Sequence, residues 1–118
     1  MKLSVTSWSF PQCSFKEAVG ISSLLNINAI DISYFYRSAL DKELLLQDHK
    51  KIVDQINKYE IDYANLYHLF GNSLEDRNLA DTNNLKDNVT DLTKVTDFCV
   101  DANIPSIFVS PGMINNGQ

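Results

Sequence analysis

The chain has 118 residues, 44% of them apolar, which suits a single globular domain spanning residues 1–118. Its net charge of -5 provides no basic face for phosphate backbones and disfavours nucleic acid as a partner. No run approaches the roughly 18 apolar residues of a membrane span, and hydroxyl residues interrupt the stretch LSVTSWSF where a secretory signal would be apolar, so we expect a cytoplasmic protein with no membrane partner.

Four short segments are apolar or β-branched and are bounded by turn residues, which predicts strands. They are Lys2–Phe10, Ala29–Tyr36, Ile61–His68 and Ser106–Ser110. Three segments with helical periodicity lie between them. The first begins at the capping box of Ser14 and Glu17 and runs to Asn26, the second spans Asp41–Tyr59, and the third spans Asn84–Ala102. The polar stretch Asn72–Asn84 is predicted to be a long loop.

Each predicted helix has an apolar stripe that we expect to face the core. The stripes are Ala18, Ile21 and Leu25 in the first helix, Leu45, Ile52, Ile56 and Tyr59 in the second, and Leu85, Val89, Leu92, Val95, Cys99 and Ala102 in the third. His49 lies on the second stripe, where a packing histidine is favoured over a ligand. Asp87 and Asp91 are predicted to lie on a solvated face. Cys99 is expected to be a small core residue, and for Cys13 an inert thiol is favoured over a pocket residue.

The order β-α-β-α-β-α-β predicts an α/β fold with parallel strands and right-handed crossovers. A doubly wound open sheet and a closed barrel both accept this order. The first strand-helix turn, WSFPQCS, has no glycine for a dinucleotide and carries Trp8 and Phe10 instead. These aromatic residues either line a ligand site at the barrel mouth or cap the core beneath the loop.

The last predicted strand is followed only by MINNGQ after SPG, without a segment that could form a covering helix. A parallel sheet needs both of its faces buried. We therefore expect parallel (β/α) units that form the first half of a TIM-type (β/α)8 barrel.

The ends of the four predicted strands together resemble the sugar phosphate isomerase/epimerase superfamily, the xylose isomerase-like barrels that include endonuclease IV type enzymes. The similar segments are LSVTSWSFPQCSFKEAV, LLNINAIDISYF, IDYANLYHLFGN and DANIPSIFVSPG. The resemblance covers the whole chain but only the N-terminal half of the family's barrel, and it lies in the order and spacing of the segments.

Several residues depart from the family's pattern. Asn28 replaces a common glycine, Asp31 replaces a common glutamate, and Ser110 replaces the histidine of a His-Pro-Gly sequence. In the endonuclease branch that histidine binds zinc together with one that His68 matches. Because Ser110 is a poor substitute, the resemblance favours the sugar branch over DNA repair.

For the sugar branch the resemblance implies a divalent metal ion (Mn, Mg, Co or Zn) and proton transfer next to a sugar carbonyl. The four metal ligands of the family come from later strands, so none is placed on this chain and the chain alone is expected to be inactive. The resemblance implies substrate-binding residues Trp8, Phe10, Asp31, Tyr34 and His68, with His68 also catalytic. A structural role for His68 remains equally open. Tyr36 and Arg37 are further candidates at the same strand end.

The sequence leaves two other hypotheses about the function open. One is a non-catalytic sugar-binding or self-associating half-barrel, which allows a homo-oligomer. The other is a small complete α/β domain with an unrelated role. In the favoured reading the partner is a small-molecule sugar or sugar phosphate.

Overall fold

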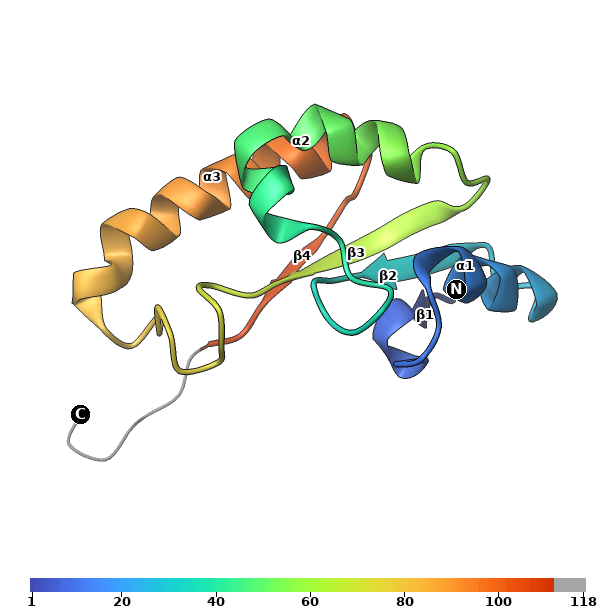
Figure 1. Ribbon diagram of the computed structural model, residues 1–118, viewed down its shortest axis with the longest axis horizontal. Helices are drawn as coiled ribbons and strands as arrows, with labels where there is room; N and C mark the ends of the chain where they lie inside the picture. The colour runs from blue at the N-terminus through green and yellow to red at the C-terminus, as the bar shows by residue number, and fades with distance from the viewer. Residues whose placement is uncertain (112–118) are drawn as a thin grey trace.

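The computed structural model describes residues 1–111, which form one parallel sheet and its connecting helices (Figure 1). The strands are β1 (Val5–Thr6), β2 (Ala29–Ile32), β3 (Asp62–His68) and β4 (Ile107–Val109). The helices are α1 (Phe15–Leu24), α2 (Lys42–Ile56) and α3 (Leu85–Asp101), with short 3-10 helices η1 (Ser7–Ser9) and η2 (Thr82–Asn84). The α/β class and the alternation of strands and helices are therefore confirmed.

The strands lie in the order β1-β2-β3-β4, and every neighbouring pair is parallel. A doubly wound sheet reverses its strand order at a switch point. Residues 1–111 contain no such reversal. An unreversed order with right-handed crossovers places every connecting helix on the same face of the sheet, as in one half of a (β/α) barrel.

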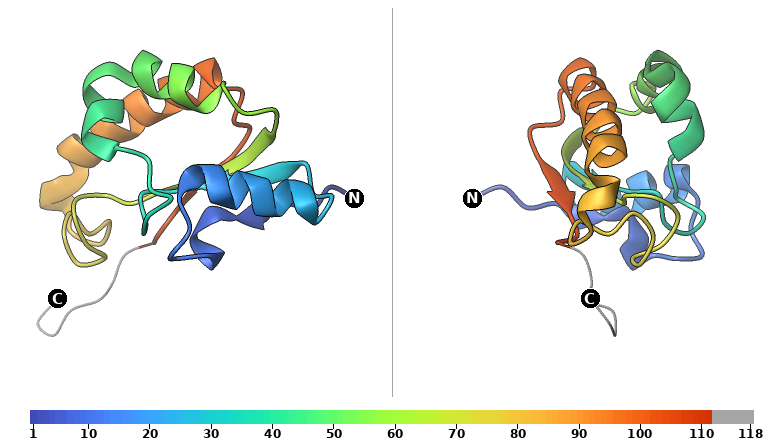
Figure 2. Two further views of the ribbon diagram at one scale, coloured as in Figure 1. Left: turned by 45° about the vertical axis from the view of Figure 1, so that its right-hand side comes forward. Right: turned by 90° about the vertical axis from the view of Figure 1, so that its left-hand side faces the viewer.

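The core confirms that the three helices share one face. Buried apolar residues of α1, α2 and α3 join alternate residues of the strands in one cluster. The strand members include Ile30 and Ile32 of β2 and Leu66 of β3. Figure 2 shows α2 and α3 side by side on that side of the sheet. The opposite face, which we call the open face, has no helix over it among residues 1–111.

All four strands are shorter than the sequence predicted, and the first two are much shorter. The first leaves the sheet after Thr6, where hydroxyl side chains compete with sheet hydrogen bonds: the hydroxyls of Thr6 and Ser9 bond each other and close the turn of η1. The second ends at Ile32, because the Ser33 hydroxyl accepts a hydrogen bond from the amide of Phe35 at 3.2 Å. The chain then turns.

Two of the predicted helical stripes are partly wrong. In α1, Leu25 is exposed and Ser22 is buried, because the Ser22 hydroxyl donates a hydrogen bond to the carbonyl of Ile27 and so satisfies its polar atom. In α3, Leu85 and Val89 are exposed while Asn88 is buried. The stripe of α2 is confirmed for Leu45, Ile52 and Ile56, which are all buried. The expectation that no helix follows the fourth strand falls on residues 112–118, outside the described residues.

Three single-residue expectations can also be compared with the structure. Cys99 is buried in the core, as predicted. His49 is a packing residue, because its ring lies against Phe98 and its Nε2 atom is 2.6 Å from Asp101 Oδ2. Asp91 is not solvated: its carboxylate is paired with Arg77 at 2.8 Å and its side chain is only 17% exposed.

Candidate functional site

Four aromatic rings contact one another in a row across the open face, near the carboxyl ends of the strands. Tyr67 lies at the centre of this aromatic row, with ring centroids 6.0 Å from Trp8, 5.1 Å from Phe35 and 4.8 Å from Phe108. Each residue comes from a different strand or from the segment just after it. Trp8, Phe35 and Tyr67 are half-buried, and Phe108 is 52% exposed. The row therefore offers an accessible apolar surface.

The alternation of side chains along the strands explains why the row faces away from the helices. Successive residues of a strand point to opposite faces of the sheet. Leu66 lies in the core beneath the helices, so Tyr67 points to the open face. Tyr67 and Phe108 are direct register partners in β3 and β4, which brings their rings together.

A polar layer lies beneath the aromatic row on the same face. Asp31 is a register partner of Thr6 in β1 and of Asn65 in β3. The Ser4 hydroxyl donates a hydrogen bond to Asp31 Oδ1 at 3.1 Å. Partial burial raises the pKa of the Asp31 carboxyl, and the hydrogen bond from Ser4 opposes that rise. Asp31 is thus a half-buried acidic group that shares the face of Trp8.

His68 and Tyr34 lie on the other face, toward the helices. The Tyr34 hydroxyl is 3.0 Å from His68 Nδ1, and the His68 ring packs edge-on against Phe70 at 4.7 Å. His68 has no exposed surface, and its Nε2 atom has no hydrogen-bond partner among residues 1–111. Burial, followed by the positive charge of Lys42, lowers the pKa of His68 to about 4, so the ring is neutral at pH 7.

The structure therefore divides the predicted site residues between the two faces of the sheet. Trp8 and Asp31 belong to the open face, whereas the half-buried Tyr34 and the buried His68 form a pair beneath the helices. Phe10 is half-buried in the turn after η1, where its carbonyl accepts a hydrogen bond from the amide of Cys13 at 3.0 Å.

The residues after β2 lie at the same end of the sheet as the row. The exposed Tyr36 has a positive φ of 61° and its ring contacts Phe35. The guanidinium of Arg37 donates a hydrogen bond to the carbonyl of Gln12, which ties the β2 end to the turn that carries Trp8. The turn after β2 and the turn that carries Trp8 are thereby joined at the carboxyl ends of the strands.

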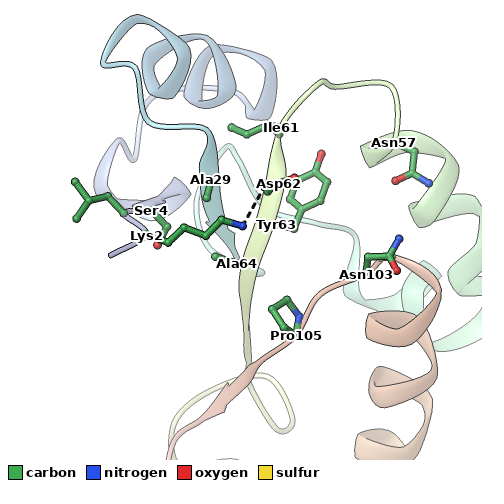
Figure 3. Close-up of a pocket in the computed structure, with 12 residues that line it drawn as sticks. Lys2, Ser4, Ala29, Asn57, Ile61, Asp62, Tyr63, Ala64, Asn103 and Pro105 are labelled. Carbon is green, nitrogen blue, oxygen red and sulfur yellow. Dashed lines mark hydrogen bonds and ion pairs between the residues drawn. The ribbon is translucent and has the colours of Figure 1, made fainter.

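A separate hollow of about 410 Å³ lies at the opposite, amino ends of the strands (Figure 3). Asp62 lines this hollow and pairs with Lys2 at 3.5 Å, with both side chains largely exposed. Ligands of parallel α/β sheets bind at the carboxyl ends of the strands. We therefore place the candidate site at the aromatic row and not at this hollow.

Residues 1–111 do not fit the divalent metal ion that the family resemblance implies. They contain no group of three or more His, Cys, Asp or Glu side chains that could hold a metal ion. The acidic residue and the histidine predicted for the site, Asp31 and His68, lie on opposite faces of the sheet.

The comparisons with family models, curated proteins and solved structures found no match to this chain. None of the helices in the described part of the chain is both long enough and apolar enough to cross a membrane.

Sequence reasoning missed three members of the aromatic row, namely Phe35, Tyr67 and Phe108. Their signal is the alternation of the strand: each directly follows a residue that lies in the core or packs against it. Reading that alternation requires the register of all four strands, which local periodicity does not provide.

Proposed function

We propose that this chain is the substrate-binding half of a TIM-type barrel that acts as a sugar or sugar phosphate isomerase or epimerase in the cytoplasm. One observation carries the proposal: a row of aromatic rings lies at the carboxyl ends of four parallel strands, on the only sheet face without helices among residues 1–111. In a closed barrel this face would be the interior, and these ends would form the ligand-binding mouth.

The chemistry of the open face suits a sugar. Aromatic faces pack against the apolar C-H patches of a sugar ring, and a small number of polar groups fix its orientation. Trp8 and Tyr67 supply the faces, and the Asp31 carboxylate supplies a hydrogen-bond acceptor for a hydroxyl group.

Proton transfer next to a carbonyl is the reaction that the resemblance implies, and a metal ion would polarise the sugar oxygens. Because residues 1–111 do not fit that ion, its ligands would have to come from other segments. This chain's own contribution is to bind and orient the sugar and to exclude water from one side of it. A catalytic role of His68 stays a prediction. Its buried ring lies beneath the helices, on the face of the sheet opposite to the proposed sugar site.

Trp8 is the only tryptophan of the chain and therefore reports directly on the proposed site. The protein is titrated with a panel of neutral monosaccharides and sugar phosphates while Trp8 fluorescence is recorded. We expect a saturable change with at least one sugar. A flat response to the whole panel, together with no sugar-dependent shift in melting temperature, would refute sugar binding.

The reaction class needs its own measurement. Incubation of the bound sugar with the protein and added divalent metal in D2O should replace the proton next to the carbonyl by deuterium, which proton NMR detects. If sugar binds and no deuterium enters, the chain belongs to a binding protein, as in the second reading of its sequence.

Two aromatic substitutions separate binding from folding. We expect Trp8→Ala to weaken sugar binding by roughly tenfold, the equivalent of about 1.4 kcal/mol, with little loss of stability. The matched control is Phe15→Ala, because the Phe15 ring packs against Tyr59 and Tyr63 on the helix side. It should lower stability and leave the affinity for sugar unchanged. The reverse pattern would make Trp8 a core residue.

A further inference from the structure

The amine of Lys42 joins three elements of the fold at one point. Lys42 is the first residue of α2, and its Nζ donates hydrogen bonds to the carbonyls of Leu69 and Gly71, just after β3 ends. The same Nζ lies 5.5 Å from the centre of the Tyr34 ring, just after β2. One cation therefore connects the start of α2 to the ends of the two central strands.

The Lys42 amine that donates these hydrogen bonds is partly desolvated. Burial lowers the pKa of the Lys42 amine, and the carboxylates of Asp91 and Asp76 oppose that shift. A half-buried cation is retained at a cost, and its hydrogen bonds to neutral carbonyls are stronger than those between two uncharged groups. The carbonyls of Leu69 and Gly71 are consequently held in place.

The segment that follows the two carbonyls bonded by Lys42 is also held in place by side-chain contacts. Gly71 has a φ of +66°, and the Asp76 side chain packs so closely over it that an added Cβ would lie 2.4 Å from Asp76 Oδ2. Asp76 Oδ2 accepts a hydrogen bond from the Asn72 amide at 2.8 Å. Farther along, Arg77 bonds Asn88 at 2.9 Å and Asp91 at 2.8 Å. The loop after β3 is thus fastened to α2 at one end and to α3 at the other.

The clamped carbonyls lie two and four residues after Tyr67, the central ring of the aromatic row. We propose that Lys42 is a positioning residue for the sugar site: by holding the carbonyls of Leu69 and Gly71, it fixes the end of β3 and with it the Tyr67 ring against Trp8. The claim that Lys42 serves a sugar site rests on the proposed function. The claim that Lys42 fixes the end of β3 is independent of it.

The chain offers a matched control on the same helix. Lys51 lies in α2, is 67% exposed, and pairs only loosely with Asp48 at 3.6 Å. Lys42→Met and Lys51→Met therefore make the same chemical change at a clamping and at a solvated position. Lys42→Arg is the conservative variant, since a guanidinium keeps the charge and the donors, and a hollow of about 500 Å³ beside Lys42 offers space.

The first measurement is backbone amide hydrogen exchange in residues 69–77 and needs no sugar. We expect Lys42→Met to speed exchange there by roughly tenfold or more, while Lys51→Met leaves it unchanged and Lys42→Arg restores most of the protection. Equal effects of the two methionine variants on this exchange would refute the proposal that Lys42 holds the end of β3 in place. Should Lys42→Met fail to fold, wild-type exchange in this segment at the rate of an unstructured peptide would overturn it equally.

The second measurement follows the aromatic row through Trp8. In Lys42→Met, release of Tyr67 should shift Trp8 emission and increase its quenching by acrylamide, with no such change in Lys51→Met. Sugar affinity of the variant should fall in parallel. A protein that binds no sugar but shows the exchange and Trp8 effects would refute the proposed function and leave the clamp standing; unchanged Trp8 emission would refute the link from the clamp to the row.

Discussion

At the residue scale, the buried neutral ring of His68 makes the stability of the fold depend on pH. Burial and the nearby Lys42 lower its pKa from 6.5 to about 4, so between those values the unfolded chain binds a proton that the folded chain does not. The stabilising contribution is complete above pH 6.5 and is lost as the pH falls toward 4, by at most about 3 kcal/mol.

Urea unfolding of the wild type and of His68→Gln between pH 4 and 7 measures this dependence. The wild type should lose stability steadily as the pH is lowered, and His68→Gln should lose less, because glutamine does not titrate. The difference between the two curves isolates His68 from the other acidic and histidine groups. Parallel curves would show that His68 does not titrate differently in the folded and unfolded chain.

The same residue shows how far a sequence can predict a site. The sequence places Trp8 and His68 at strand ends, and the structure confirms that both lie there. The predicted third strand also ends at His68, but the sequence does not show that Leu66 faces the core, so that Tyr67 and not His68 reaches the open face. A difference of one position decides the face of a strand residue. The single bulge between β2 and β3, at Ile30/Asp31, is invisible in a period-two pattern.

At the element scale, the positions of the helices were predicted well because the signals for where a helix begins are local. The capping box of Ser14 and Glu17 is present, and the Asp41 side chain caps α2 by accepting a hydrogen bond from the Leu44 amide at 3.0 Å. The ends of β1 and β2 were predicted poorly, because hydroxyl side chains within apolar runs redirect the backbone there.

The glycine of the β3-α3 loop provides a prediction at this scale. Gly71 has a positive φ, and a Cβ added there would clash with Asp76, so Gly71→Ala should destabilise the fold by about 1–3 kcal/mol. Gly20 lies inside α1 with nothing within 4 Å of an added Cβ, so Gly20→Ala should stabilise by about 0.5–1 kcal/mol. Chemical denaturation of the two variants checks the opposite signs. Unchanged or increased stability of Gly71→Ala would mean that the loop geometry has no special cost.

At the scale of the whole molecule, the strand order was the feature that the alternation of strands and helices left undecided, and the half-barrel was expected on other features of the sequence. The alternation of strands and helices favours parallel pairing but accepts both a doubly wound sheet and a barrel. Choosing between them depends on which strands are neighbours, a property of contacts between distant segments. The order β1-β2-β3-β4 places α1, α2 and α3 over the residues that include Ile30 and Leu66, and so leaves Phe108 on the open face.

A parallel sheet is normally covered on both faces, and the open face of this chain carries an exposed aromatic surface instead. The 118-residue chain should therefore bind a hydrophobic dye such as ANS while it remains folded. Phe108→Ser should lower dye emission, because Phe108 is the exposed end of the aromatic row. Val100 is more exposed, at 69%, but lies on α3, so Val100→Ser should change emission little. Equal losses of dye emission in the two variants would show that the dye binds scattered apolar residues. The aromatic row would then not form a continuous apolar surface.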